Sequence, residues 1–248
     1  MSALDTEKRL TPSHWIDRLG TNEALKLQLD SQAEASSAVR LALPQIKTAT
    51  EQAYHALSRS GSGRFIYCGA GTSARIAVQD VAELLPTFNW PAENVQFVIA
   101  GGTPALLQAA EGAEDNSADA RAQIAALNPN QSDICIGVAA SGITAFTIAA
   151  IEAAREAGAM TIGIANNPET PLLAAAEFPI LLNTGAEALA GSTRLKAGTA
   201  QKICLNLIST QIMVMLGYVK DGLMSEMVPR NEKLRRRKAE IDALLGWD

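Results

Sequence analysis

The sequence predicts an α/β fold in which a mostly five-stranded parallel sheet lies between two layers of helices. Five short apolar runs alternate with stretches of helical periodicity. The connections between the runs are long enough for crossover helices, which parallel neighbours require. The chain has 248 residues, of which 48% are apolar, so it can form one large domain with a sizeable core.

The five apolar runs are the predicted strands. A strand that is buried on both faces shows a continuous apolar run instead of an alternation of apolar and polar residues. The runs are Arg64–Cys68, Val95–Ala100, Asp133–Val138, Met160–Ile164 and Phe178–Leu182. Helices on both faces of this sheet would complete a three-layer α/β/α sandwich.

Helical patterns flank the strands at both ends of the chain. From residue 21 to 60, apolar residues recur near helical spacing, which predicts an N-terminal helical arm. The stretch from Leu195 to Tyr218 is apolar on most faces, as expected of a helix buried against the sheet or a second subunit. A last helix is expected from Asn231 to Leu245. We divide the chain into an N-terminal arm (1–60), a central domain (61–220) and a C-terminal helical segment (221–248).

Charge and hydropathy exclude several classes of function. Lys and Arg number 21 against 26 Asp and Glu, a net charge of −5, so the chain has no basic footprint for nucleic acid or an anionic membrane. The N-terminus has no apolar signal core, and polar residues interrupt the most apolar stretch, Ile203–Leu216. We expect a cytoplasmic protein with no nucleic-acid or membrane partner.

Cysteine and histidine are too sparse for metal or triad chemistry. Cys68, Cys135 and Cys204 are widely spaced within apolar runs, and we interpret them as core thiols. His14 and His55 both lie in the N-terminal region. The sequence therefore offers no His/Cys cluster for zinc and little material for a Ser-His-Asp triad.

Two hydroxyl-rich turns follow predicted strands. Gly69-Ala70-Gly71-Thr72-Ser73 opens the helix after the first strand, and Ser141-Gly142-Ile143-Thr144 follows the third. Free backbone N–H groups and the helix dipole favour a phosphate at such turns. Two of them at the carboxyl ends of parallel strands predict one phosphorylated small molecule in the crevice between them. The alternative is that Ser73 and Ser141 are only helix N-caps.

The first turn also fits the spacing of a dinucleotide fingerprint, Gly69-x-Gly71-x-x-Ala74. The second strand ends in Ala-Gly-Gly, however, without the Asp or Glu that would bind a ribose hydroxyl. Nicotinamide binding is therefore disfavoured.

A third polar segment precedes the long apolar helix. In Gly191–Thr199, two cations, Arg194 and Lys196, stand beside hydroxyl residues at the predicted helix start. Cations at this end oppose the helix dipole, so an anion or carboxylate nearby would explain them. The alternative is that both cations lie on the surface.

Several segments together resemble the N-acetylmuramic acid 6-phosphate etherases, and the resemblance covers nearly the whole chain. The segments are Ile16-Asp17-Arg18-Leu19, the turn at residues 69–75, Glu83 with Pro86-Thr87-Phe88, Ala100-Gly101-Gly102, Glu111-Gly112-Ala113-Glu114-Asp115, Ala139-Ala140-Ser141-Gly142, residues 191–202 and Asn231-Glu232-Lys233-Leu234. The resemblance implies the flavodoxin-like sugar isomerase (SIS) fold, which the glucokinase regulatory protein shares.

The resemblance also implies a reaction. The family cleaves the D-lactyl ether of N-acetylmuramic acid 6-phosphate to N-acetylglucosamine 6-phosphate and D-lactate, in peptidoglycan recycling and without a cofactor. A base removes the C2 proton of the open-chain aldehyde, an acid protonates the departing lactate, and water then adds. The resemblance therefore implies a carbon–oxygen lyase, whose chemistry needs only two carboxylates of unequal pKa.

Site residues follow from the same resemblance. Glu83 is the expected acid and Glu114 the expected base. The remaining residues are expected to bind the substrate: Ser73 and Ser141 hold the phosphosugar, Gly71, Thr72, Gly142 and Thr144 shape the loops, Ser192, Arg194 and Lys196 lie near a bound anion or at the rim, and Asn231 and Lys233 close the site.

Helix length separates two of these residues. If one helix runs from Thr72 to Glu83, its ends are about 15 Å apart, too far to serve one phosphosugar. We therefore expect Glu83 to reach into the pocket of a partner subunit, which would make the protein an obligate homodimer with a composite active site.

The chain also departs from the family pattern. The family has arginine where this chain has Ile143, and glutamate where it has Thr103. These changes keep two alternatives open: a phosphosugar-binding regulator or sensor without catalysis, and a phosphosugar isomerase.

Overall fold

A five-stranded, all-parallel sheet forms the centre of the molecule. The computed structural model describes residues 4–59, 61, 63–108, 110, 112–229 and 231–247. The strands are β1 (Phe65–Gly69), β2 (Val95–Ile99), β3 (Ile134–Val138), β4 (Met160–Ala165) and β5 (Phe178–Leu181), in the order β2-β1-β3-β4-β5. All five predicted strands are confirmed, with ends that differ by no more than one residue.

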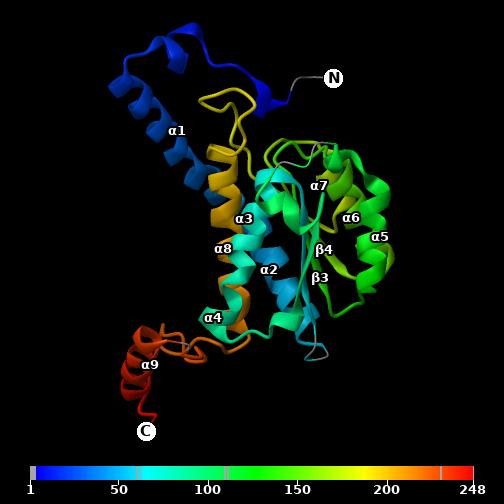
Figure 1. Ribbon diagram of the computed structural model, residues 1–248, viewed down its shortest axis with the longest axis vertical. Helices are drawn as coiled ribbons and strands as arrows, with labels where there is room; N and C mark the ends of the chain where they lie inside the picture. Colours follow the sequence, from blue (N-terminus) through cyan, green and yellow to red (C-terminus); the bar gives the residue numbers. More distant parts are fainter. Residues whose placement is uncertain are drawn as a thin grey trace.

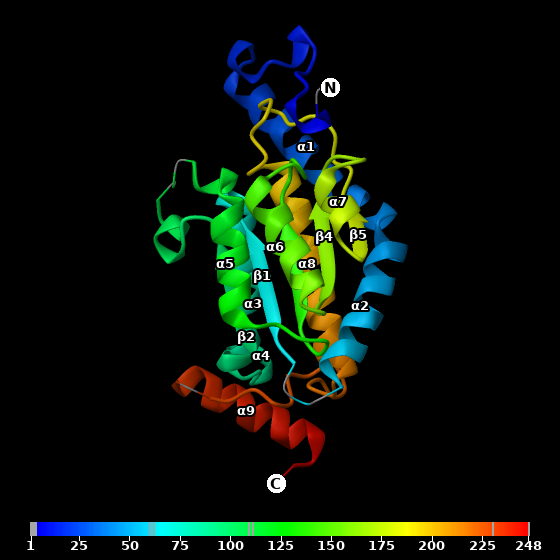
Figure 2. The same cartoon turned by 90° about the vertical axis from the view of Figure 1, so that its right-hand side faces the viewer.

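Helices cover both faces of the sheet, as predicted (Figure 2). The main helices are α1 (Thr21–Leu41), α2 (Leu43–Leu57), α3 (Gly71–Ala82), α4 (Leu84–Phe88), α5 (Ser117–Leu127), α6 (Ala145–Glu156), α7 (Pro171–Ala175), α8 (Lys196–Met215) and α9 (Glu232–Leu245). Short 3₁₀ turns lie at Asp5–Glu7, Pro12–His14, Ile16–Arg18, Ala92–Asn94, Thr103–Leu106 and Ala113–Asp115.

Alternate residues of β1 enter two different cores. Phe65 and Tyr67 pack with α2, α3 and α8 on one face, whereas Ile66 and Cys68 pack with α5, α6 and α7 on the other. Because β1 is buried on both faces, its sequence is apolar throughout. The three cysteines are buried and free, which confirms them as core thiols.

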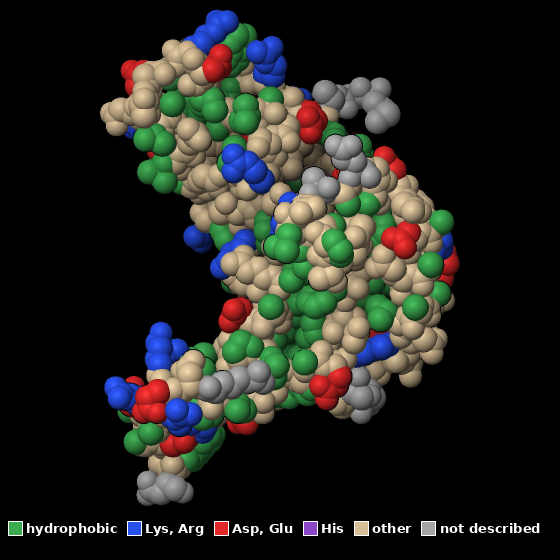
Figure 3. Space-filling model, viewed as in Figure 1, with side chains coloured by type: hydrophobic (Ala, Val, Ile, Leu, Met, Phe, Trp, Pro, Cys, Tyr) green, Lys and Arg blue, Asp and Glu red, His purple; other side chains and the backbone are tan. Residues whose placement is uncertain are grey.

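Two helices extend beyond the sandwich. Only the second half of α1 is buried, through Ala35, Ala38 and Val39, which lie over α8. The first half of α1 and the whole of α9 project from opposite ends of the molecule (Figure 1). Between them the surface is concave (Figure 3). The helix α2, which lies in the predicted N-terminal arm, belongs to the same core as the sheet. The domain boundaries at residues 60 and 220 remain predictions. Ser60 and Asp248 lie outside the described residues.

Candidate active site

The first predicted loop joins β1 to α3. The helix begins at Gly71, whose φ of +53° favours glycine, and Ala70 provides no side-chain cap. The first-turn N–H groups of α3 therefore have no partner in the helix or from a cap. Ser73 lies inside the first turn and is buried, so it is not the N-cap residue.

The second predicted loop joins β3 to α6. Ser141 Oγ accepts a hydrogen bond from the backbone N–H of Ile143 at 3.3 Å and lies 3.4 Å from Thr144 Oγ1. Because α6 begins only at Ala145, Ser141 is not an N-cap either. Gly142 has a φ of +71°, and a Cβ there would lie 2.3 Å from Thr170 Oγ1. Only glycine allows the loop to approach Thr170 in this way.

The two loops leave neighbouring strands at the same edge of the sheet. β1 and β3 are paired, with Gly69 opposite Val138 at their carboxyl ends. From this pair the chain order runs outward in opposite directions, to β2 on one side and to β4 and β5 on the other. Open α/β sheets bind ligands at such a switch point.

A cavity of about 320 Å³ adjoins the first loop. It is lined by Ala70, Gly71, Thr72, Arg75, Ala100, Ala105, Ala110, Gly112 and Glu114. The Arg75 guanidinium donates to the carbonyl oxygens of Leu106 and Ala105, so it holds the segment after β2 against α3. Glu114, the expected base, is exposed and borders the same cavity as Thr72.

The expected acid, Glu83, lies elsewhere. It is the C-terminal cap of α3, exposed, and at the opposite end of that helix from Ser73. The structure therefore brings Glu114, but not Glu83, to the first loop within one chain. Glu111, from the same sequence motif as Glu114, lies outside the described residues.

The third segment has its own carboxylates. Glu187, fully buried, accepts hydrogen bonds from the N–H groups of Lys196 and Ala197 at the start of α8. Burial raises the pKa of Glu187 even though these bonds act to lower it. Lys196 Nζ pairs with Glu34 at 2.7 Å. Glu187 and Glu34 were not identified from the sequence, although the cations at the helix start indicated that an anion or carboxylate would lie nearby.

Other residues of this segment are less buried. Ser192 is half-buried and Arg194 is exposed. A larger cavity of about 540 Å³ lies between the N-terminal segment, α1 and Lys196, but none of its lining residues belongs to either loop.

The C-terminal residues lie far from the loops of their own chain. Asn231 caps α9, accepting a hydrogen bond from the N–H of Leu234, and Lys233 follows in the first turn. Figure 1 shows α9 near α4, at the end of the molecule opposite the carboxyl ends of the strands. The structure therefore places Asn231 and Lys233 at the same end as Glu83.

The described residues contain neither a metal cluster nor a membrane-spanning helix. In that part of the chain, no group of three His, Cys, Asp or Glu side chains is arranged to hold a metal ion. None of the described helices is long and apolar enough to cross a membrane.

Two solved phosphoheptose isomerases share the fold of this chain. The phosphoheptose isomerase of Neisseria gonorrhoeae superposes with a TM-score of 0.57 at 18% identity, covering 78% of this chain and 98% of that one. The phosphoheptose isomerase of Francisella tularensis gives 0.55 at 21% identity, covering 79% and 100%. These similarities establish the fold.

Sequence comparison identifies the family. Residues 45–155 match the glucokinase regulatory protein N-terminal SIS domain, and residues 113–211 match the SIS domain. The N-acetylmuramic acid 6-phosphate etherase of Deinococcus radiodurans is 47% identical over 226 residues, 91% of this chain and 73% of that protein. The enzyme of the same name from Symbiobacterium thermophilum is 44% identical over 241 residues, 97% and 79% of the two chains. The chain belongs to the N-acetylmuramic acid 6-phosphate etherase family.

Proposed function

We propose that this chain is a carbon–oxygen lyase that cleaves the D-lactyl ether of N-acetylmuramic acid 6-phosphate. The products are N-acetylglucosamine 6-phosphate and D-lactate. Relatives of this name at 42% to 47% identity support the reaction over the regulator and isomerase alternatives. The observation that carries the proposal is the cavity that Glu114 shares with the first turn of α3.

The two loops bind the phosphosugar in this proposal. The free N–H groups at the start of α3, with Thr72 and Ser73, bind a phosphate through hydrogen bonds and the helix dipole. Ser141, Gly142 and Thr144 contact the sugar from the neighbouring strand. The adjacency of Gly69 and Val138 at the strand ends supports a single ligand between both loops.

The two glutamates divide the proton transfers. Glu114 removes the C2 proton of the open-chain aldehyde, and the electron pair forms a C2–C3 double bond as the C3–O bond breaks. Glu83 gives its proton to the departing lactate oxygen. Water then adds to C3 and a proton returns to C2, which restores both carboxyl groups and gives the second product.

In this proposal, Glu83 protonates the departing lactate in the active site of a partner subunit. The helix α3 spans Gly71–Ala82 without interruption, so Ser73 and Glu83 are about 15 Å apart along its axis. Asn231 and Lys233 lie at the same end as Glu83 (Figure 1). A two-fold dimer would bring all three to the loops of the other chain, which gives these C-terminal residues the closing role expected from the sequence.

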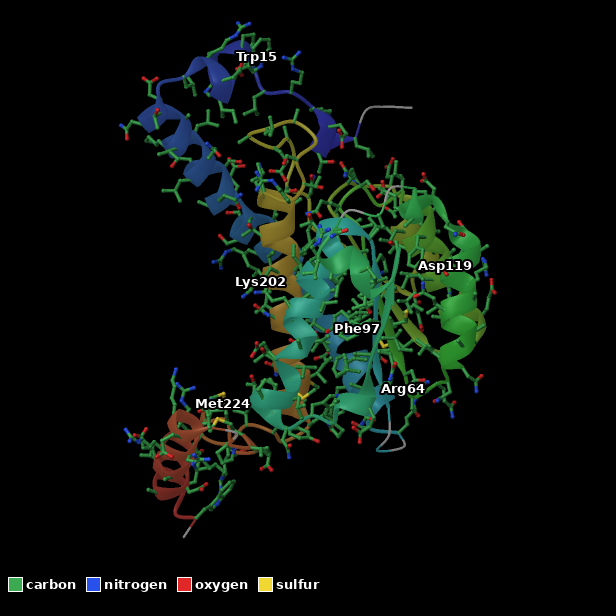
Figure 4. The ribbon with its side chains drawn as sticks, viewed as in Figure 1. Trp15, Arg64, Phe97, Asp119, Lys202 and Met224 are labelled. Atoms are coloured by element: carbon green, nitrogen blue, oxygen red, sulfur yellow. The ribbon has the colours of Figure 1, made fainter. Side chains whose placement is uncertain are left out.

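Exposed leucines on α1 and α8 support the proposal that this chain forms a dimer. Leu25 and Leu29, one turn apart on α1, have 61% and 69% of their surface exposed, and Leu207 on α8 is also exposed. Lys202, on α8, points to the concave side between α1 and α9 (Figure 4). A second copy of the chain that covered these leucines would remove their apolar surface from water.

The cellular setting follows from the family reaction. A substrate of this kind is a fragment of cell-wall amino sugar, so the protein acts in peptidoglycan recycling in the cytoplasm. Ser192, Arg194 and Lys196 lie at the rim of the site in this proposal, where Lys196 acts through its pair with Glu34.

One experiment tests the reaction and the two glutamates. The purified protein is incubated with N-acetylmuramic acid 6-phosphate, and D-lactate and N-acetylglucosamine 6-phosphate are quantified together. We expect equal amounts of both products, and a loss of at least about 100-fold in rate for Glu83→Gln and for Glu114→Gln. Binding of sugar phosphates without any release of lactate would instead favour the regulator.

A further inference from the structure

Thr6 lies in the N-terminal segment, far in sequence from both loops, yet it is fully buried. Its N–H donates to Asn167 Oδ1 at 3.1 Å, and its Oγ1 accepts from Asn167 Nδ2 at 3.0 Å. Asn167 is itself almost completely buried, just after β4. The Asn167 side chain therefore pairs with both the backbone N–H and the hydroxyl of Thr6, in a contact buried from water.

The Asn167 side chain also contacts the second loop, which carries Ser141. Its Nδ2 also donates to the carbonyl oxygen of Ala140, at 2.9 Å, directly before Ser141. The backbone N–H of Leu172 donates to the carbonyl oxygen of Gly142, directly after Ser141. The same carbonyl oxygen of Ala140 also accepts from the backbone N–H of Asn166 at 3.0 Å. Ser141 is thus held between two anchored peptide groups, and the Asn167 side chain supplies one of the two donors to the first.

Thr6 also contacts the third segment. Its carbonyl oxygen accepts from the N–H of Gly191 at 3.0 Å, next to Ser192. The Glu7 carboxylate lies beside Gly191, whose φ of +76° is one that glycine adopts readily. Figure 1 shows this N-terminal segment beside the loop that precedes α8. Residues 5–7 therefore join the loops that carry Ser141 and Ser192.

We propose that Thr6 and Asn167 are positioning residues that fix the Ser141 loop for phosphosugar binding. This inference rests on the proposed function, because it takes Ser141 as a ligand-binding residue. Neither side chain contacts the substrate. A buried amide that anchors both the N-terminal segment and the peptide before Ser141 keeps the loop in one conformation, so the ligand does not have to order it.

Asn166 provides a matched control. It is adjacent, equally buried and also an amide, but its Nδ2 donates to the carbonyl oxygen of Leu182 and its Oδ1 accepts from Gln201. Asn166→Asp and Asn167→Asp introduce the same charge at neighbouring buried positions. Only the second removes the side-chain donor to Ala140 and Thr6.

The test is the dissociation constant for N-acetylglucosamine 6-phosphate, measured by calorimetry, together with kcat and KM for the full substrate. For Asn167→Asp we expect the dissociation constant and KM to rise about tenfold relative to Asn166→Asp, the size of one lost hydrogen bond. The value of kcat should change less, because Glu83 and Glu114 lie on other elements. Equal effects of the two substitutions would overturn the inference.

A milder pair of variants keeps the test decisive if Asn167→Asp does not fold. Thr6→Val removes the hydroxyl without adding charge, whereas Thr6→Ser keeps it. We expect weaker binding with valine and wild-type binding with serine; identical constants for both would refute the role of Thr6. A wild type that neither binds nor cleaves overturns the proposed function and this inference together, whereas an active wild type with unaffected variants overturns the inference alone.

Discussion

Two inactive variants should restore activity to one another if the active site is shared between subunits. Glu83→Gln removes the proposed acid and Glu114→Gln the proposed base. In a composite dimer each site takes Glu114 from one chain and Glu83 from the other. A mixed dimer then has one site with both substitutions and one site that is intact.

The expected magnitude follows from this arrangement. Random exchange of equal amounts gives half mixed dimers, and each has one intact site of two. The mixture should therefore recover about a quarter of wild-type activity, and purified mixed dimers about a half. The basis in the structure is the uninterrupted helix α3, which separates Ser73 from Glu83 by about 15 Å.

The assay is D-lactate release after the two variants are co-expressed with different affinity tags and the mixed dimer is isolated through both tags. A dimer of two differently tagged Glu83→Gln chains is the control, and it should stay inactive. If both glutamates served one site within a chain, every site of the mixed dimer would carry one substitution. An inactive mixed dimer, or a fully active wild-type monomer in sedimentation, would therefore refute the composite site.

Two further predictions concern binding and stability. Ile143 is 43% exposed and its N–H donates to Ser141 Oγ, so Ile143→Arg should add a guanidinium donor and tighten phosphosugar binding about tenfold; an unchanged dissociation constant in calorimetry would contradict this. Burial acts to raise the pKa of Asp133, but hydrogen bonds from Arg64 and from the backbone N–H of Asn130, together with the Arg64 charge, outweigh it and hold that pKa below its ordinary value. The pair therefore stabilises the fold above the unfolded pKa of about 3.9, and this stability is lost as the pH falls through the lower folded pKa. In urea unfolding, Asp133→Asn should cost about 3 kcal/mol at pH 7 and less as the pH approaches 3; a cost independent of pH would contradict it.

The strands were predictable because each is a short apolar run buried on both faces. The strand β3, for example, ends at Val138 as predicted and begins at Ile134, one residue after the predicted start at Asp133. The division between α1 and α2 was not predicted, since apolar spacing continues through it. Its physical cause is Pro44, which is compatible with the first turn of α2 but not with the interior of a longer helix.

The candidate site was predictable only where its signal is local. A glycine and hydroxyl turn after an apolar run predicts a loop at the carboxyl end of a strand, and both such loops are present. The partners of Thr6 and Lys196 were not predictable, because Asn167 and Glu34 are 161 and 162 residues away from them along the chain. No periodicity in a single sequence encodes a contact at such a separation.

The direction in which Glu83 points depends on packing inside its own subunit. One turn before it, buried Asp80 accepts hydrogen bonds from Tyr67 Oη, Ser209 Oγ and Asn206 Nδ2, which fixes α3 against β1 and α8. Burial raises the pKa of Asp80, and these bonds act against the rise. Since a helix fixed at one turn determines the direction of the next, this network sets where Glu83 projects. In the proposed dimer, α3 therefore serves two sites at once, with its first turn in one pocket and its last residue in the other.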